Sequence, residues 1–205
     1  MRESTLEQSE NMSQIKQVQL RRASLADAEA IAAVRVEAWR ESYREIVPAA
    51  YLAEMSIDES RLQWQRILEA MQDNLDKICV YVAESDGHIV GFASANLLEH
   101  EKFGMQAELS SVYLRPAWQR SGIGRRLLDK LARTVQQMGA RSMLVWVFAE
   151  NRIGRNFYEE LSGEFLHEQE FSWDGLDLRE VAYGWSDLNV LRAATQAHGA
   201  SEAVH

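Results

Sequence analysis

The stretch Val112-Tyr113-Leu114-Arg115-Pro116-Ala117-Trp118-Gln119-Arg120-Ser121-Gly122-Ile123-Gly124 decides the fold of this chain. It ends a run of strand-forming residues that starts at Glu108, and it closes on a Gly-x-Gly turn. This order predicts an anion site, because a helix N-terminus offers unpaired amide groups and the positive end of the helix dipole. The helix itself is indicated by apolar residues at helical spacing, namely Ile123, Leu127, Leu128, Leu131, Val135 and Met138.

Positive charge is concentrated at this turn. The 205 residues carry 22 Lys+Arg and 31 Asp+Glu, a formal net charge of -9. Residues 115–133 hold six basic residues and one acid, so this segment is +5 and the rest of the chain is -14. The acidic total argues against nucleic acid as a partner. The local surplus fits an anionic ligand at the turn, or arginines that simply face water.

The common nucleotide motifs are absent from the turn. A dinucleotide site needs a third glycine after Gly122 and Gly124, and the residues there are Arg125, Arg126 and Leu127. No Gly-Lys-Ser/Thr sequence follows, which excludes a P-loop of the NTPase kind. The alternative is a strand-to-helix turn whose glycines serve backbone geometry alone.

Outward from the turn, the pattern predicts a single α/β (α+β) domain in the order β-α-α-β-β-β-α-β-α-β-β. Its central sheet is mixed and mostly antiparallel, with flanking helices and a βαβ-like centre. Asp86-Gly87 and Asp174-Gly175 are hairpin signals, and Ser24 and Ser56 are helix starts. Strands are expected at 18–22, 78–82, 89–92, 108–114, 141–148, 165–173 and 176–185, with later helices at 123–138 and 151–161.

The ends of the chain are polar. We expect a mobile tail at 1–16, one domain at 17–188 and a C-terminal tail at 189–205. No run of 18 apolar residues predicts a membrane span, and the start MRESTLEQSE lacks the apolar core of a signal peptide. These features predict a cytoplasmic protein without a membrane partner. Cys79 is the single cysteine, and the five histidines show no metal-binding spacing, so no metal is expected.

Two motifs together resemble the GCN5-related N-acetyltransferases (GNAT family). Gln119-Arg120-Ser121-Gly122-Ile123-Gly124, with Pro116 before it, is similar to the family's Gln/Arg-x-x-Gly-x-Gly/Ala turn. Asn151-x-x-Gly154-x-x-Phe157-Tyr158-Glu159, followed by Phe165, is similar to its Asn-x-x-Ala-x-x-Phe-Tyr-Glu helix. Gly154 replaces the usual alanine, and the helix exit is one residue longer than a Leu-Gly-Phe ending. The resemblance covers about residues 18–185.

The resemblance implies that acetyl-CoA is the cosubstrate and that its pyrophosphate binds at the turn. It also implies that Tyr158 is the general acid for the departing thiolate and that Asn151 contacts the cofactor. Asn151 and Tyr158 are seven residues apart and share one helix face, with Gly154 leaving room between them. The cofactor-binding residues expected are Val112, Tyr113, Leu114, Gln119, Arg120, Ser121, Gly122, Ile123, Gly124, Arg125, Asn151, Gly154 and Tyr158.

A base and an acceptor wall are also indicated. Glu108 lies four residues before Val112 and is expected on the same side of the strand; it resembles the glutamate that relatives use as the base. The alternative is a solvated carboxylate. Trp39 and Tyr43 are expected in the acceptor wall, in the position where relatives form it, and the alternative is an aromatic core pair.

The function predicted is transfer of an acetyl group from acetyl-CoA to a primary amine by direct attack in a ternary complex. The acceptor is a small amine or a peptide N-terminus, and the -14 remainder would suit a cationic one. The alternatives are a non-catalytic acetyl-CoA-binding sensor and a protein-interaction domain whose basic face meets an acidic partner. The exposed C-terminal strands can pair in a homodimer.

Overall fold

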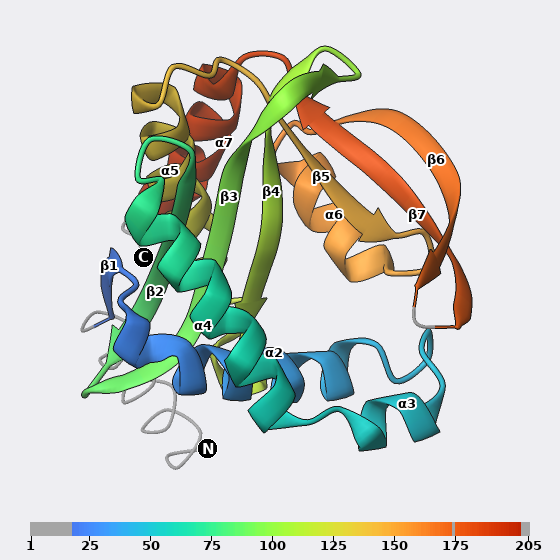
Figure 1. Cartoon of the computed structure of the whole chain (residues 1–205). Coiled ribbons are helices and arrows are strands. Elements are labelled where there is room, and N and C mark those ends of the chain that lie inside the picture. Colours follow the sequence, from blue (N-terminus) through green and yellow to red (C-terminus); the bar gives the residue numbers. More distant parts are fainter. Residues whose placement is uncertain (1–17, 174, 202–205) are drawn as a thin grey trace, which may run out of the picture.

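A computed structural model of the chain describes residues 18–173 and 175–201. Its core is one seven-stranded sheet in the order β1-β2-β3-β4-β5-β7-β6, shown in Figure 1. The β4–β5 pair is parallel, and the other neighbouring pairs are antiparallel. The strands are β1 (Gln19–Arg22), β2 (Ile78–Ser85), β3 (His88–Lys102), β4 (Met105–Leu114), β5 (Met143–Phe148), β6 (Glu164–Trp173) and β7 (Leu176–Trp185).

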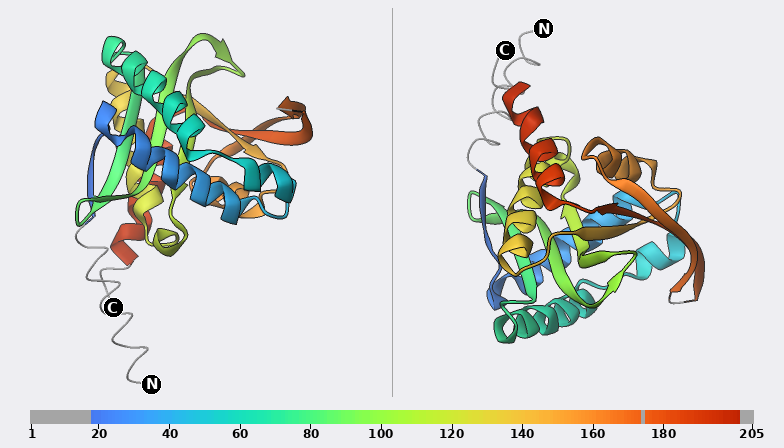
Figure 2. Two further views of the ribbon diagram at one scale, coloured as in Figure 1. Left: turned by 60° about the horizontal axis from the view of Figure 1, so that its bottom comes forward. Right: turned by 90° about the horizontal axis from the view of Figure 1, so that it is seen from above.

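Helices cover both faces of this sheet, as Figure 2 shows edge-on. On one face α2 and α4 pack over a cluster that includes Trp64, Leu68 and Phe92. On the other face α5, α6 and α7 share a cluster that includes Leu127, Leu161 and Leu191. The helices are α2 (Ala28–Ser42), α3 (Ala49–Glu54), α4 (Ile57–Asp73), α5 (Ile123–Gln137), α6 (Arg152–Glu160) and α7 (Leu188–Ser201), with short 3-10 turns η1 (Leu25–Asp27) and η2 (Pro116–Trp118).

The predicted α/β class and the mostly antiparallel sheet with a parallel centre are confirmed. The predicted order lacked α3 and α7. The prediction of a C-terminal tail at 189–205 is wrong for residues 189–201. These residues belong to α7, which runs to Ser201 and buries Leu188 and Leu191 against the core. The 1–16 tail, Asp174 of the second hairpin turn, and residues 202–205 lie outside the described residues.

The two central strands separate partway along their length. β4 and β5 pair at Ala107, Glu108 and Leu109, and no pairing between them continues past Leu109 in the described chain. β4 nevertheless runs on to Leu114 along β3. One edge of β4 is therefore left unpaired where the strands diverge, beside α6 (Figure 1).

A β-bulge lies at the point of divergence. Ser94 pairs with Ser111, but the next residue, Ala95, pairs with Leu109, so Ser110 is an extra residue in β4. Because side chains alternate between faces, the bulge places Glu108 on the same face as Ser111 and Tyr113, opposite Val112. The prediction that Glu108 and Val112 point to the same side is wrong for this reason.

Candidate functional site

The glycine turn has the backbone conformation that the sequence predicts. Arg120 and Gly122 have φ values of 57° and 77°, and Gly122 is the residue before the first turn of α5. A Cβ built on Gly122 would have no atom within 4 Å, so the space above it is open. The first amides of α5 lack partners within the helix. The turn is therefore an open cradle of amide donors at the positive end of a helix dipole, suited to a phosphate group.

The second glycine of the turn serves packing. A Cβ on Gly124 would lie 3.4 Å from Phe157 and 3.8 Å from Leu114, and the Ile123 side chain is fully buried. Gly124 thus lets α5 approach the end of β4 and the side of α6. Ile123 and Gly124 can offer a ligand their backbone amides.

Most of the basic residues around the turn are engaged within the protein. Arg125 donates to Glu160 at 2.6 Å and lies over the Phe157 ring, and Arg115 pairs with Glu37. Arg126 donates to the carbonyl of Val18. Arg120 has no ion pair among residues 18–173 and 175–201, and the Nη1 atom of Arg125 is buried without a hydrogen-bond partner there. Arg120 is therefore the basic residue of the turn that is left without a carboxylate partner in the described ranges, whereas Arg125 is paired and keeps one buried N–H without a partner.

Three tyrosine hydroxyls come together where β4 and β5 diverge. Tyr158 on α6 is 7% exposed, and burial followed by the neighbouring Tyr113 raises the pKa of its hydroxyl above the usual value. Burial is also the main reason why the pKa of Tyr43 is raised, with further contributions from Tyr113 and Tyr158. The hydroxyls of Tyr43 and Tyr158 therefore remain protonated at neutral pH.

Asn151 connects this cluster to α6. Its side-chain oxygen accepts from the backbone amide of Gly154 at 2.9 Å, which caps the helix, and its side chain lies beside Tyr43 and opposes the rise in the pKa of that hydroxyl. The space left by Gly154 is filled, because a Cβ there would lie 2.7 Å from the Asn151 amide nitrogen and 3.0 Å from Val147. Gly154 thus accommodates the cap, which corrects the prediction that it leaves room for a ligand.

Removal of this cap gives a first prediction. Asn151→Ala should cost about 1 kcal/mol of stability, as lost N-caps do, and should also lower turnover because Tyr43 loses a partner. Ser56→Ala is the control, since Ser56 caps α4 by accepting from Glu59 at 3.3 Å. Urea unfolding and kcat measure the two effects. Equal turnover in both variants would contradict a positioning role for Asn151.

Glu108 lies beside the point where β4 and β5 diverge, on the face of the sheet that also carries Ser111 and Tyr113. Burial raises the pKa of its carboxyl, Lys102 opposes this shift and Glu180 adds to it. A carboxylate that holds its proton more tightly than usual is a stronger base once ionised. The structure thus gives the predicted base a suitable electrostatic setting, on the face opposite the side chain of Val112.

Trp39 and Tyr43 form an aromatic cluster with Phe148 of β5. The ring centroids of Trp39 and Tyr43 are 4.9 Å apart, and those of Tyr43 and Phe148 are 5.0 Å apart, both edge-to-face. These side chains are buried, as an aromatic core pair would be, and Trp39 also lines a pocket; their place in an acceptor wall stays a prediction.

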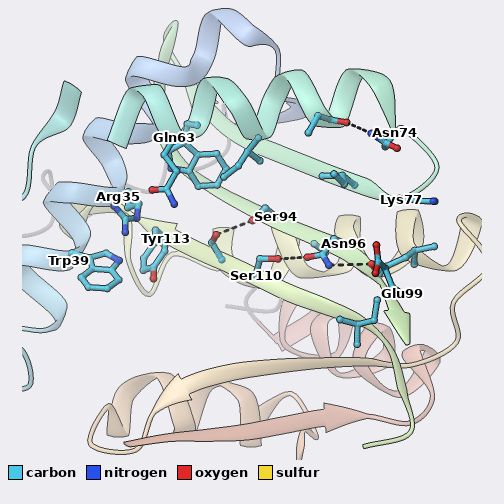
Figure 3. A pocket seen from close by; sticks show the side chains of 18 residues that line it. Arg35, Trp39, Gln63, Asn74, Lys77, Ser94, Asn96, Glu99, Ser110 and Tyr113 are labelled. Carbon is cyan, nitrogen blue, oxygen red and sulfur yellow. Dashed lines mark hydrogen bonds between the residues drawn. The ribbon is translucent and has the colours of Figure 1, made fainter. Parts of the chain in front are cut away.

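That pocket has a volume of about 870 Å³ and lies between α4, α2 and strands β3 and β4, as Figure 3 shows. Trp39 and Tyr113 mark one end, and Lys77 and Glu99 the other. Its polar wall was not predicted from the sequence, since single serines and amides in strands carry no distinctive signal. That wall includes Arg35, Gln63, Asn74, Ser94, Asn96, Ser110 and Ser111.

Other groups named from the sequence play lesser parts. Cys79 is fully buried, and burial raises the pKa of its thiol to about 11, which fits a core residue. No group of three metal-ligating side chains occurs within the described ranges. No helix in those ranges is long and apolar enough to cross a membrane.

A family model and several known proteins match a part of the chain that includes both motifs. The model of the Acetyltransferase (GNAT) family matches residues 36–163. A Bacillus subtilis protein described as the uncharacterized N-acetyltransferase YuaI is 38% identical over 177 residues, which are 85% of this chain and 96% of that protein. The spermidine N(1)-acetyltransferase of Thermoplasma acidophilum is 27% identical over 69% of this chain and 84% of its own.

A solved structure agrees at the level of the fold. The PaiA N-acetyltransferase of Thermoplasma acidophilum, in complex with coenzyme A, matches with a TM-score of 0.64 at 24% identity. The match covers 82% of this chain and 99% of that one. The separating strands and the cradle thus belong to an architecture that binds coenzyme A in another protein.

Proposed function

The chain belongs to the acetyltransferase (GNAT) family and is an acetyl-CoA-dependent N-acetyltransferase, and on that premise we propose which reaction its site carries out. The acceptor is the primary amine of a small molecule or of a peptide N-terminus. The amine attacks the thioester directly while both substrates are bound. The single observation that carries this proposal is the meeting of Tyr158, Tyr113 and Tyr43 where β4 and β5 separate.

The cradle supplies binding. The first backbone amides of α5, at Ile123, Gly124 and Arg125, have no partner within the helix, and the space above Gly122 is open, so the pyrophosphate of acetyl-CoA would lie there. Arg120, which has no ion pair in the described ranges, adds positive charge beside it. The unpaired edge of β4 at Val112–Leu114 offers further backbone groups for the rest of the cofactor and for the thioester oxygen.

The chemistry then needs one base and one acid. Acetyl-CoA supplies the acetyl group as a thioester, a C–N bond forms and the C–S bond breaks. Glu108 accepts the proton lost by the amine, directly or through a water molecule. The Tyr158 hydroxyl donates a proton to the departing sulfur, for which its raised pKa keeps it protonated. The products are the amide and coenzyme A as a thiol.

The function is tested by release of free thiol from acetyl-CoA when amines are added to the full chain. Thiol release that depends on both an amine and the protein, with the acetylated amine detected by mass spectrometry, is the expected result. Binding of acetyl-CoA without transfer across a broad amine panel would overturn the proposal and favour the sensor alternative. The homodimer stays a prediction, with β6 as the outer strand of the sheet.

Glu108→Gln should separate catalysis from stability. Without the carboxylate, kcat/KM should fall about 100-fold, and the decline of activity at acidic pH should disappear. Stability should change in the opposite direction. The pKa of the Glu108 carboxyl is raised in the folded state, so the ionised carboxylate lowers the free energy of unfolding at pH values above that pKa. This penalty vanishes at pH values below the pKa that Glu108 has in the unfolded chain. The variant should therefore gain melting temperature relative to the wild type at pH 8 but not at pH 4.

Glu101→Gln is the control for this change, because Glu101 is an exposed carboxylate on the same hairpin that accepts from Gln106. It should leave both the pH profile and the activity near those of the wild type. A wild-type pH profile in Glu108→Gln would remove Glu108 as the base.

A further inference from the structure

We propose that the acceptor amine also carries a carboxylate, and that Arg35 binds this group in the pocket between α2, α4 and β3. The inference rests on the proposed function and names the substrate class for the same site. It starts from Arg35, a half-buried cation in the pocket wall that has no carboxylate partner among the described residues.

Arg35 is held in position by contacts that leave its charge unbalanced. Its Cζ atom lies 5.0 Å from the centroid of the Trp39 ring, and its Nη1 atom is 3.5 Å from the hydroxyl of Ser60. Both partners are uncharged. A guanidinium that is stacked on an aromatic ring is already oriented, so it loses little freedom when it binds a carboxylate with two parallel hydrogen bonds.

Two other partly buried arginines of this protein, Arg21 and Arg125, are paired with carboxylates. Arg21 pairs with Asp27 at 2.7 Å and with Glu84 at 2.6 Å, and Arg125 pairs with Glu160 at 2.6 Å. Arg35 differs from them in facing a cavity of about 870 Å³. The chain thus keeps one stacked guanidinium available to the occupant of this pocket.

The remaining charges of the pocket do not balance Arg35. Lys77 and Glu99 are its other charged lining residues, both are exposed, and both lie at the opposite end in Figure 3. The end marked by Trp39 and Tyr113 therefore holds a single formal charge, which is positive. A polyamine there would place an ammonium group beside Arg35, whereas an amine with a carboxylate would pair with it. This local charge opposes the cationic acceptor that the -14 remainder suggested.

Arg35 lies in line with side chains that extend toward the reacting groups. Trp39 and Tyr43 follow Arg35 at intervals of four residues along α2, so the three share one helix face and span about 12 Å between the first and last Cα atoms. Tyr113 lines the same pocket and lies close enough to Tyr158 to contribute to the raised pKa of that hydroxyl. A carboxylate bound at Arg35 would thus direct the rest of the acceptor past Trp39 toward the tyrosine cluster.

The test compares matched amines with the full chain and acetyl-CoA. Each amino acid of a small panel is assayed beside its carboxamide and its decarboxylated amine, and spermidine serves as the polyamine. The wild type should prefer the carboxylates by at least about 30-fold in kcat/KM, the size expected for a charged hydrogen-bonded pair. Arg35→Gln should remove this preference mainly through KM, while activity toward the partners that lack a carboxylate should stay within about threefold.

Arg44→Gln is the matched control. Arg44 is exposed and forms only long ion pairs with Glu41 and Glu45, at 3.8 and 3.5 Å, away from the pocket. This variant should keep the carboxylate preference. An equal loss for all amines in Arg35→Gln would show that Arg35 only packs on Trp39, and preferred turnover of spermidine by the wild type would also overturn the inference.

A second measurement is independent of turnover. N-acetylated amino acids, the products of the predicted acceptors, should raise the melting temperature of the wild type in the presence of coenzyme A more than the matching amides do. Arg35→Gln should abolish that difference, and its absence in the wild type would overturn the carboxylate site. Failure of every amine to release thiol, with this thermal difference intact, would overturn the proposed function and leave the anion site standing.

Discussion

Tyr158→Phe is expected to lower kcat about 100-fold while changing the KM for acetyl-CoA by less than about threefold. The substitution removes one hydroxyl from a side chain that is 7% exposed, and the ring keeps its packing against Tyr183 and Trp185. Without the hydroxyl, coenzyme A must leave as an unprotonated thiolate. Because burial and Tyr113 keep the pKa of the Tyr158 hydroxyl high, the loss should be the same across neutral and mildly alkaline pH. Steady-state kinetics at several pH values measure it.

Tyr81→Phe is the control for this experiment. Tyr81 is buried on β2, and its hydroxyl hydrogen-bonds with Thr134 at 3.0 Å, within the core under α5. Its loss should cost about 1 kcal/mol of stability and leave turnover unchanged. Unchanged turnover in Tyr158→Phe would remove Tyr158 as the acid and would direct attention to Tyr113.

Gly122→Val is expected to raise the KM for acetyl-CoA about 100-fold. Valine at a φ of 77° strains the backbone by about 1–2 kcal/mol, and its side chain would enter the open space above the turn. Both effects act on the amide cradle. Calorimetric titration with acetyl-CoA and the KM from thiol release give independent measures of the lost affinity.

Gly139→Val is the control that separates the effect of backbone strain from the loss of acetyl-CoA binding. Gly139 follows the C-terminal end of α5, has a φ of 101°, and also has open space around its missing Cβ. The two variants should lose comparable stability, and acetyl-CoA affinity should fall in Gly122→Val alone. Equal affinities in the two variants would exclude the turn as the cofactor cradle.

Local patterns were sufficient to predict most elements of the fold. The hairpin at Asp86-Gly87 and the helix start at Ser56 appear where they were expected, because each rests on turn or capping chemistry within four residues. The helix α7 was not predicted, since its core contacts at Leu188 and Leu191 are spread through a polar, alanine-rich segment. Its stability comes from packing on α5, a contact between segments distant in sequence.

The candidate site shows the same division between local and long-range information. The cradle and Tyr158 could be predicted because their motifs are contiguous and each is confined to one turn or one helix. The face of the sheet on which Glu108 lies could not be predicted, because a bulge depends on how two strands pair. Arg35 was also missed, because an unbalanced charge is recognised only when all its neighbours are known.

The extra residue in β4 has a consequence for how such a site can change over generations. It places Val112 and Leu114 on one face of the sheet and Glu108, Ser111 and Tyr113 on the other. Point substitutions alter the groups on each side but cannot exchange the sides. Loss of the single codon for Ser110 would move Glu108 across the sheet in one event. Substitutions in this strand should therefore change activity by degrees, whereas deletion of Ser110 should abolish it.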